Sequence, residues 1–204
     1  MKSLSGLLTI SLLILCLNST QLTAQTAQTL FDSDVRHGGF GGPVVKFSQV
    51  ADQGSVWVGG RGGWIIVFDD SNSLSLGGGG YGLVTNHPAD NTLDEDLYAM
   101  AGYGGFEFEY TYKSHRLLHF SMKNLIGGGG LMLRDRDFEE IDENVNNFFV
   151  FEPSLNAELN VTGFFRISAG AGYLFTSGIN RFGFSDNDFS GLNANITLKF
   201  GSFL

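Results

Sequence analysis

The sequence is poor in three features, and each scarcity excludes a class of protein. Its one cysteine, Cys16, lies in an apolar segment near the N-terminus, so a chain that loses this segment has no disulfide to stabilise it. No segment has the roughly 18 uninterrupted apolar residues of a transmembrane helix, which excludes a helical membrane protein. Lys and Arg number 12 against 21 Asp and Glu, for a net charge of −9, and this acidic balance argues against nucleic acid as a partner.

Residues 1–24 have the pattern of a secretory signal peptide. Lys2 gives a short positive start, residues 7–17 are almost wholly apolar, and Ala24 offers a small residue for cleavage. Removing this segment removes Lys2, the one charge it carries, and takes the formal charge from −9 to −10. Cys16 follows a leucine where a lipoprotein signal needs a small residue, so we do not expect lipidation.

Glycine and phenylalanine are abundant, with 29 and 19 residues. The ordinary share of glycine is about 7%. The glycines have no three-residue period, which excludes collagen, and so many phenylalanines argue against disorder. Residues 25–37 are polar and predict a flexible N-terminal segment, whereas residues 38–204 alternate glycine-rich and aromatic runs with polar turns. We expect this second segment to form one domain.

The clearest strand pattern spans residues 148–175. Phe149 and Leu155 fall on one parity and Glu152 and Glu158 on the other, and the same alternation resumes after a short polar turn. This period of two predicts a β-hairpin with one apolar and one polar face. Strands of ten to thirteen residues exceed the usual length of roughly five to six residues. They match the apolar band of an outer-membrane barrel, which is about 25 Å tall.

The remaining chain contains six further strands of this kind. The predicted strands are residues 39–50, 54–68, 73–85, 97–111, 116–130, 147–159, 163–176 and 190–201. Connections after the even-numbered strands are short, and those after the odd-numbered strands are long except for the first. Short periplasmic turns and longer external loops produce this alternation. The predicted fold is therefore all-β, an eight-stranded antiparallel up-and-down transmembrane β-barrel with both termini on the periplasmic side.

The parity of the strands places charged residues on the inner face of this barrel. The predicted lumen charge network comprises Lys46, Arg61, Glu107, Glu109, Lys123, Glu152, Glu158, Arg166 and Lys199. The interior of an eight-stranded barrel is about filled by side chains, and buried charges need partners. Glu107 and Glu109 are candidate partners for Arg166. The candidate partners for Glu152 and Glu158 of the hairpin are Arg61, Lys123 and Lys199. A plugged lumen is the prediction; the alternative is an ion or substrate path lined by these charges.

Aromatic residues near strand ends or on the outward parity predict girdles at the two membrane interfaces. The residues considered are Trp57, Trp64, Tyr98, Tyr110 and Tyr173. The same aromatics would also suit the core of a soluble protein.

Together, the signal peptide, the eight strands, the segment FEPSLNAELNVTGFFRISAGAGYLF and the last strand LNANITLKF, ending at Phe200, carry a family resemblance. The chain resembles small, porin-like outer-membrane β-barrel proteins of Gram-negative bacteria, particularly of the Bacteroidetes type. The resemblance implies insertion into the cell outer membrane by the barrel-assembly machinery, with a terminal aromatic as the signal. The resemblance leaves open whether Phe200 or Phe203 is this aromatic. It also implies contact with membrane lipid and lipopolysaccharide, and we expect a monomer.

Two motifs suggest chemistry that differs from this interpretation. Gly77, Gly79 and Gly82 match a dinucleotide fingerprint, but no helix is predicted after them, so chance in a glycine-rich chain explains the match. His119 and Ser121 have the His-x-Ser spacing used by the outer-membrane lipid A deacylase, yet the following residues do not continue that motif and the pair faces the lumen. No catalytic residue is therefore assigned, and we expect no enzyme activity.

The acidic loop at residues 131–146, with residues 94–96, has oxygen ligands of the kind that Ca²⁺ prefers, but lacks the spacing of a calcium loop. A solvated loop is the preferred interpretation. His37, His87 and His115 lie apart in the sequence and predict no zinc site. No cofactor or metal is expected.

Three functions remain after these exclusions. The first is a plugged outer-membrane barrel with a structural or surface-interaction role. The second is a small porin or carrier of the same fold. The third is a soluble, secreted lipocalin-like barrel that binds an apolar ligand, in which the apolar face would lie inside and the polar face outside.

Overall fold

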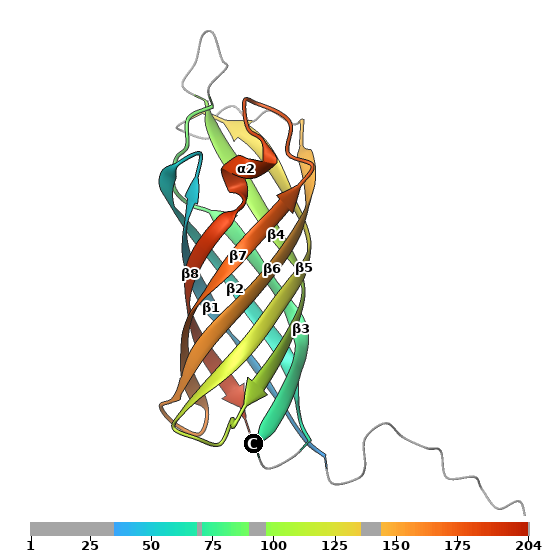
Figure 1. Cartoon of the computed structure of the whole chain (residues 1–204), viewed down its shortest axis with the longest axis vertical. Coiled ribbons are helices and arrows are strands. Elements are labelled where there is room, and N and C mark those ends of the chain that lie inside the picture. Colours follow the sequence, from blue (N-terminus) through green and yellow to red (C-terminus); the bar gives the residue numbers. More distant parts are fainter. Residues whose placement is uncertain (1–34, 69–70, 90–96, 136–143, 204) are drawn as a thin grey trace, which may run out of the picture. The chain divides into compact units, whose positions relative to one another are not determined.

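The computed structural model describes residues 35–68, 71–89, 97–135 and 144–203. In these residues, eight antiparallel strands form a closed up-and-down barrel, in which each strand pairs with the next and the last pairs with the first (Figure 1). The strands are β1 (Arg36–Val50), β2 (Gln53–Val67), β3 (Asn72–Leu83), β4 (Tyr98–Tyr112), β5 (Leu118–Arg134), β6 (Asn146–Asn160), β7 (Phe165–Ser177) and β8 (Gly191–Ser202). The predicted fold class is confirmed.

All eight predicted strands are present, and three of them, β1, β5 and β6, are longer than predicted. β1 begins at Arg36, inside the segment expected to be flexible, because Arg36 and His37 pair with the end of β2. β5 continues through Arg134, into the predicted acidic loop. Leu131 and Leu133 extend the alternation there and are buried. The signal peptide lies outside the described residues.

The two ends of the barrel differ in their connections. The 113–117 and 161–164 turns, the end of β2 and the start of β3 lie at the end where β8 finishes, which we call the turn end (Figure 1). The tight turn between β1 and β2 and the β7–β8 connection lie at the opposite end, the loop end. There, the short helix α2 (Asp186–Phe189) lies between β7 and β8. No helix in the described part of the chain is long and apolar enough to cross a membrane.

The strands carry apolar side chains on the outside and polar side chains on the inside of the barrel. In β6, Phe149 is 51% exposed and Leu155 is 67% exposed, whereas Glu152 and Glu158 are wholly buried. The same alternation holds in β4, β5 and β8. Exposed large side chains from β1, β2 and β4–β8 cover the outer face: Phe47, Val58, Trp64, Phe106, Phe108, Phe120, Met122, Ile126, Phe149, Leu155, Tyr173, Phe175, Leu192, Ile196 and Phe200. A lipocalin-like barrel has the opposite arrangement, so that alternative is wrong about which face lies inside.

The interior at the loop end is apolar, which the sequence did not predict. Trp57, expected in an interface girdle, is buried inside at 2% exposure. Its ring lies edge-on to Tyr103 and to Phe189 of α2, with centroid distances of 5.2 and 6.4 Å. Phe184 and Ile179 of the β7–β8 connection join the same buried cluster. This apolar cluster, with α2 packed against it, lies inside the barrel at the loop end.

Hydrogen bonds hold the β7–β8 connection over this cluster. The hydroxyl of Thr176 donates to the Asp186 carbonyl at 2.8 Å, and the Ile179 N–H donates to the Asp186 carboxylate at 2.7 Å. The N–H of Ala51, in the neighbouring β1–β2 turn, donates to the Asp188 carbonyl at 2.9 Å. The loop end is thus tied together from two separate connections.

Changing the two-residue turn between β1 and β2 tests this geometry. Ala51 and Asp52 both have positive φ, 48° and 60°, as in the tight hairpin turn that favours Asn-Gly. The left-handed conformation costs a non-glycine residue about 1 kcal/mol. We therefore expect the double variant Ala51→Asn, Asp52→Gly to raise the free energy of unfolding by about 1 kcal/mol, measured by urea titration. Asp52→Val, which puts a β-branched residue at positive φ, should lower it.

Candidate functional site

The structure places all nine residues of the predicted charge network inside the barrel. None is more than 7% exposed, and Glu152 and Glu158 are completely buried. They come from β1, β2, β4, β5, β6, β7 and β8, and each occupies the inward parity of its strand. Because charges removed from water need compensation, their pairing determines what this interior can do.

Seven ionisable groups form one connected chain of contacts across the barrel. Arg61 binds Glu107 through Nε at 2.5 Å and Glu109 through Nη1 at 2.8 Å. Lys199 binds Glu109 at 2.6 Å and Glu158 at 2.5 Å. Two further contacts complete the chain, Lys123 to Glu107 at 3.3 Å and His119 to Glu158 at 3.4 Å. Strands that are not neighbours in the sheet, such as β4 and β8, are therefore linked through the interior.

Lys46 and Glu152 form a second, separate pair. Their closest N–O distance is 2.6 Å. The hydroxyl of Tyr103 donates to Glu152 at 2.9 Å and accepts from Lys46 at 3.0 Å, and the Lys46 ammonium lies 3.4 Å from the centre of the Tyr81 ring. The sequence did not predict this pairing, since Arg61, Lys123 and Lys199 were the expected partners of Glu152. Of the expected pairs, Lys199 with Glu158 is present.

Arg166 stands apart from both groups. It forms no ion pair with any residue in the described part of the chain, so its expected pairing with Glu107 or Glu109 is wrong. Its guanidinium instead donates to the backbone carbonyls of Ser114 and Phe203 at 3.3 and 3.4 Å. The pairing differs from expectation because it depends on how far each strand is shifted along its neighbour, and strand parity does not determine that shift.

Glycine makes room for the bulky members of the network. A Cβ atom on Gly79 would lie 2.7 Å from both Glu107 Oε1 and the Tyr81 hydroxyl, so a side chain there would displace one of these two groups. Tyr81 donates to Glu107 at 2.6 Å at this position. The whole apparent dinucleotide fingerprint lies within β3, and no helix follows it, so these glycines belong to the barrel wall.

His119 and Ser121 both bind Glu158 and do not bind each other. Ser121 donates its hydroxyl to Glu158 at 2.7 Å, and His119 Nδ1 lies 3.0 Å from the Arg116 carbonyl. A nucleophilic serine needs its hydroxyl hydrogen-bonded to the base. In this barrel the Ser121 hydroxyl is bonded to Glu158 and not to His119. Both side chains are buried in the interior beside the ion pairs.

A layer of buried amides lies beside the network where β6, β7 and β8 meet. Atoms of Ser154, Asn156, Asn193 and Asn195 have no hydrogen-bond partner in the protein. These residues lie opposite Gly170 and Gly172 of β7, where a Cβ on Gly170 would overlap Asn156 Oδ1. Buried polar groups of this kind commonly bond to water, so the interior contains unpaired polar groups as well as ion pairs.

The three remaining histidines, His37, His87 and His115, lie on the outer face, in the β3–β4 connection and in the 113–117 turn. His37 stacks on Trp64 on the outer face, with a centroid distance of 5.2 Å. His87 lies in the β3–β4 connection with Nε2 2.9 Å from both the Ser55 and Thr85 hydroxyls, and burial lowers the pKa of His87. Among the described residues, no three His, Cys, Asp or Glu side chains could hold a metal ion. Residues 94–96 and 136–143, which carry the other acidic candidates, lie outside the described residues.

Comparison with known proteins identifies no family for this chain. No protein-family model matches the sequence, and no curated protein matches it. The solved structures with a similar chain path include Neisserial surface protein A, with 6% identity, a TM-score of 0.47 and coverage of 83% of this chain and 99% of that chain. They also include Ail, the attachment invasion locus protein of Yersinia pestis, in complex with the heparin analogue sucrose octasulfate. Ail in that complex has 10% identity and a TM-score of 0.48, with coverage of 81% and 97%. With TM-scores below 0.5, these similarities carry no functional inference.

The Lys46–Glu152 pair is suited to a double-mutant cycle because it is separate from the other ion pairs. Lys46→Met leaves a buried carboxylate unpaired, and we expect it to lower the free energy of unfolding by about 3–5 kcal/mol. Glu152→Gln should have a similar effect, whereas the double variant should be less destabilised than the sum by about 1–3 kcal/mol. Urea unfolding in lipid vesicles measures each value. Lys113→Met, which removes a lysine from the 113–117 turn, is the control. Additive effects of the two substitutions in the cycle would contradict the pairing.

Proposed function

We propose that this protein is an integral outer-membrane β-barrel with a closed, ion-paired interior and a structural or surface-interaction role. One observation carries the proposal: the same strands expose large apolar side chains outside and bury paired charges inside. In water this arrangement would expose a broad apolar surface, which soluble monomers rarely do. In a bilayer the apolar outer face contacts lipid, and the charges remain paired inside the barrel.

The lengths of the strands support the same environment. The shortest, β3 and β8, have 12 residues, and the longest, β5, has 17. At about 3.3 Å per residue and a tilt near 40°, a strand of 12 residues rises about 30 Å, which exceeds the apolar band of about 25 Å. Closure of the sheet leaves no unpaired strand edge to face lipid.

The proposal that the interior is closed rests on two layers of side chains. The ion pairs cross the middle of the barrel, and the apolar cluster around Trp57 and Phe189 fills the loop end. Eight strands enclose a space about wide enough for side chains alone. The buried amides are the feature that favours the alternative, a small porin or carrier of the same fold, because polar space could conduct water or ions.

The proposed partners are outer-membrane lipid and lipopolysaccharide, with the barrel-assembly machinery during insertion. Of the two terminal aromatics, Phe200 fits that insertion role better. Phe200 is 45% exposed on the outer face and stacks on Phe165 at 4.8 Å. Phe203 is 8% exposed and packs against Phe40 and Arg166, so a partner outside the barrel cannot reach it.

A charged substitution on the outer face tests membrane insertion. Phe106 lies near the middle of β4 and is 54% exposed. We expect Phe106→Arg to lower the free energy of unfolding in lipid vesicles by roughly 2–4 kcal/mol, since arginine near the bilayer midplane costs that much. Leu117→Arg is the matched control, because Leu117 is 69% exposed and lies in the 113–117 turn, beyond the strands. Equal effects of the two substitutions, or extraction of the native protein by aqueous buffer alone, would reject the membrane assignment.

Recording in planar lipid bilayers separates the closed barrel from the porin. We expect the full barrel to insert without steady conductance, because ion pairs and the apolar cluster occupy its interior. Insertion is checked in the same preparation by the slower gel mobility of heated samples. Steady conductance from barrels that have inserted would establish the porin alternative.

A further inference from the structure

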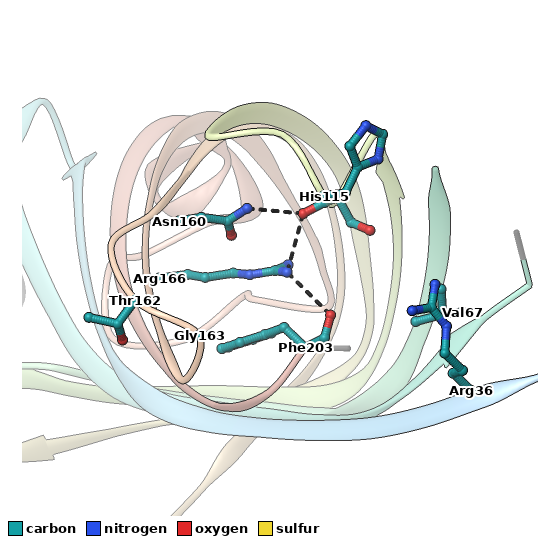
Figure 2. Close-up of a pocket in the computed structure, with 9 residues that line it drawn as sticks. Arg36, Val67, His115, Asn160, Thr162, Gly163, Arg166 and Phe203 are labelled. Atoms are coloured by element: carbon teal, nitrogen blue, oxygen red, sulfur yellow. Dashed lines mark hydrogen bonds between the residues drawn. The ribbon is translucent and has the colours of Figure 1, made fainter. Parts of the chain in front are cut away.

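The turn end of the barrel contains a cavity of about 400 Å³. It opens between the 113–117 and 161–164 turns and the ends of β1, β7 and β8. Figure 2 shows Arg166 extending across this opening toward Phe203 and the 113–117 turn. The other lining residues include Arg36, His115, Asn160 and Thr162. None of the described residues that line the cavity is acidic.

Arg166 is buried in this cavity with its hydrogen-bonding capacity only partly used. Its side chain is 7% exposed, and its guanidinium lies over the Phe203 ring at 4.1 Å. One terminal nitrogen makes the two long bonds to backbone carbonyls, and Nε has no partner. A buried guanidinium N–H without an acceptor is costly, so the arrangement calls for an acceptor from outside the protein.

The charge balance of the interior gives a second, independent argument. The predicted network has five cations and four carboxylates. Lys46, Arg61, Lys123 and Lys199 are paired with the four carboxylates, Glu107, Glu109, Glu152 and Glu158. Arg166 is the remaining cation; Glu158 and Glu109 act on it only at longer range, and no described carboxylate lies within ion-pair distance of it. A buried charge without a direct partner is unfavourable, and an anion in the cavity supplies one.

We propose that the turn end binds a small oxyanion, through a carboxylate or phosphate group, with Arg166 as its principal donor. A guanidinium is suited to such groups because its N–H donors match two oxygens of one anion. The ring of Phe203 holds the guanidinium in position, and the Thr162 hydroxyl at the rim adds a donor. The binding chemistry does not depend on a membrane. Only the expectation that the turn end faces the periplasm rests on the proposed function.

The experiment titrates inorganic phosphate, and separately succinate, into the full chain folded in an uncharged maltoside detergent, with calorimetric detection. We expect saturable binding at one site per barrel. Arg166→Gln should weaken binding about tenfold or more, because it removes a charge-assisted hydrogen bond. Arg181→Gln, which removes an exposed arginine from the loop end, is the matched control and should leave binding unchanged.

A second variant keeps the test valid if Arg166→Gln does not fold. Thr162→Asp adds a negative charge at the rim of the cavity, in an exposed turn, and should weaken binding about threefold or more through repulsion of the anion. Val161→Asp adds the same charge to the neighbouring exposed residue, which does not line the cavity, and should have less effect. Equal effects of these two variants would overturn the site.

Three other results would also overturn the proposal. The first is the absence of saturable binding by either probe. The second is binding only to vesicles that contain phosphatidylglycerol, which would identify a lipid headgroup and not a small anion. The third is binding only after two neutral residues are added beyond Leu204, which would show that the chain's own terminal carboxylate occupies the cavity. Because the calorimetry is done in detergent, its failure leaves the membrane assignment untouched.

Discussion

The pairing of buried charges is the constraint on which the rest of this barrel depends. Arg61, Lys199 and their carboxylate partners lie where little water can solvate them, and an unpaired charge there would cost several kcal/mol. The pairs join β2 to β4, β4 to β8 and β6 to β8 through the interior. They form together only when the sheet has closed with one particular stagger. We infer that the ion pairs help to select this stagger among those that the strand pattern alone would allow.

The outer face and the glycines follow from that interior. Charged groups can line the inside only if the apolar residues of the same strands face outward, because alternation leaves no third position. Long side chains such as Arg61 and Tyr81 then need space in a narrow barrel, and residues without side chains provide it. Gly62 and Gly63 of β2 pair with Gly78 and Gly77 of β3. This glycine-rich wall is the structural reason for the unusual glycine content of the chain.

The sequence predicted the faces of the strands but not the level of each residue along the barrel axis. Parity alone assigns Arg166 to the inside, and that was correct. Its partners depend on stagger, so the expected pairing with Glu107 or Glu109 was wrong. Trp57 shares its parity with Arg61, four residues away on β2, so the sequence did contain the information that it faces inward. Phe184 and Phe189 lie in a connection with no periodic pattern, and nothing in the sequence indicated that they would cover the interior.

The distribution of charge along the barrel narrows the places where it can meet a solute. In the middle, every carboxylate of the network already has a cationic partner, so a ligand there would have to break an existing pair. At the loop end, the interior is lined by a buried cluster of apolar groups that includes Phe189 of α2. The turn end differs, because Arg166 brings a positive charge to an open cavity with no carboxylate among its described lining residues. A ligand bound there gains an ion pair and displaces none, which favours the turn end over the rest of the interior as a binding site.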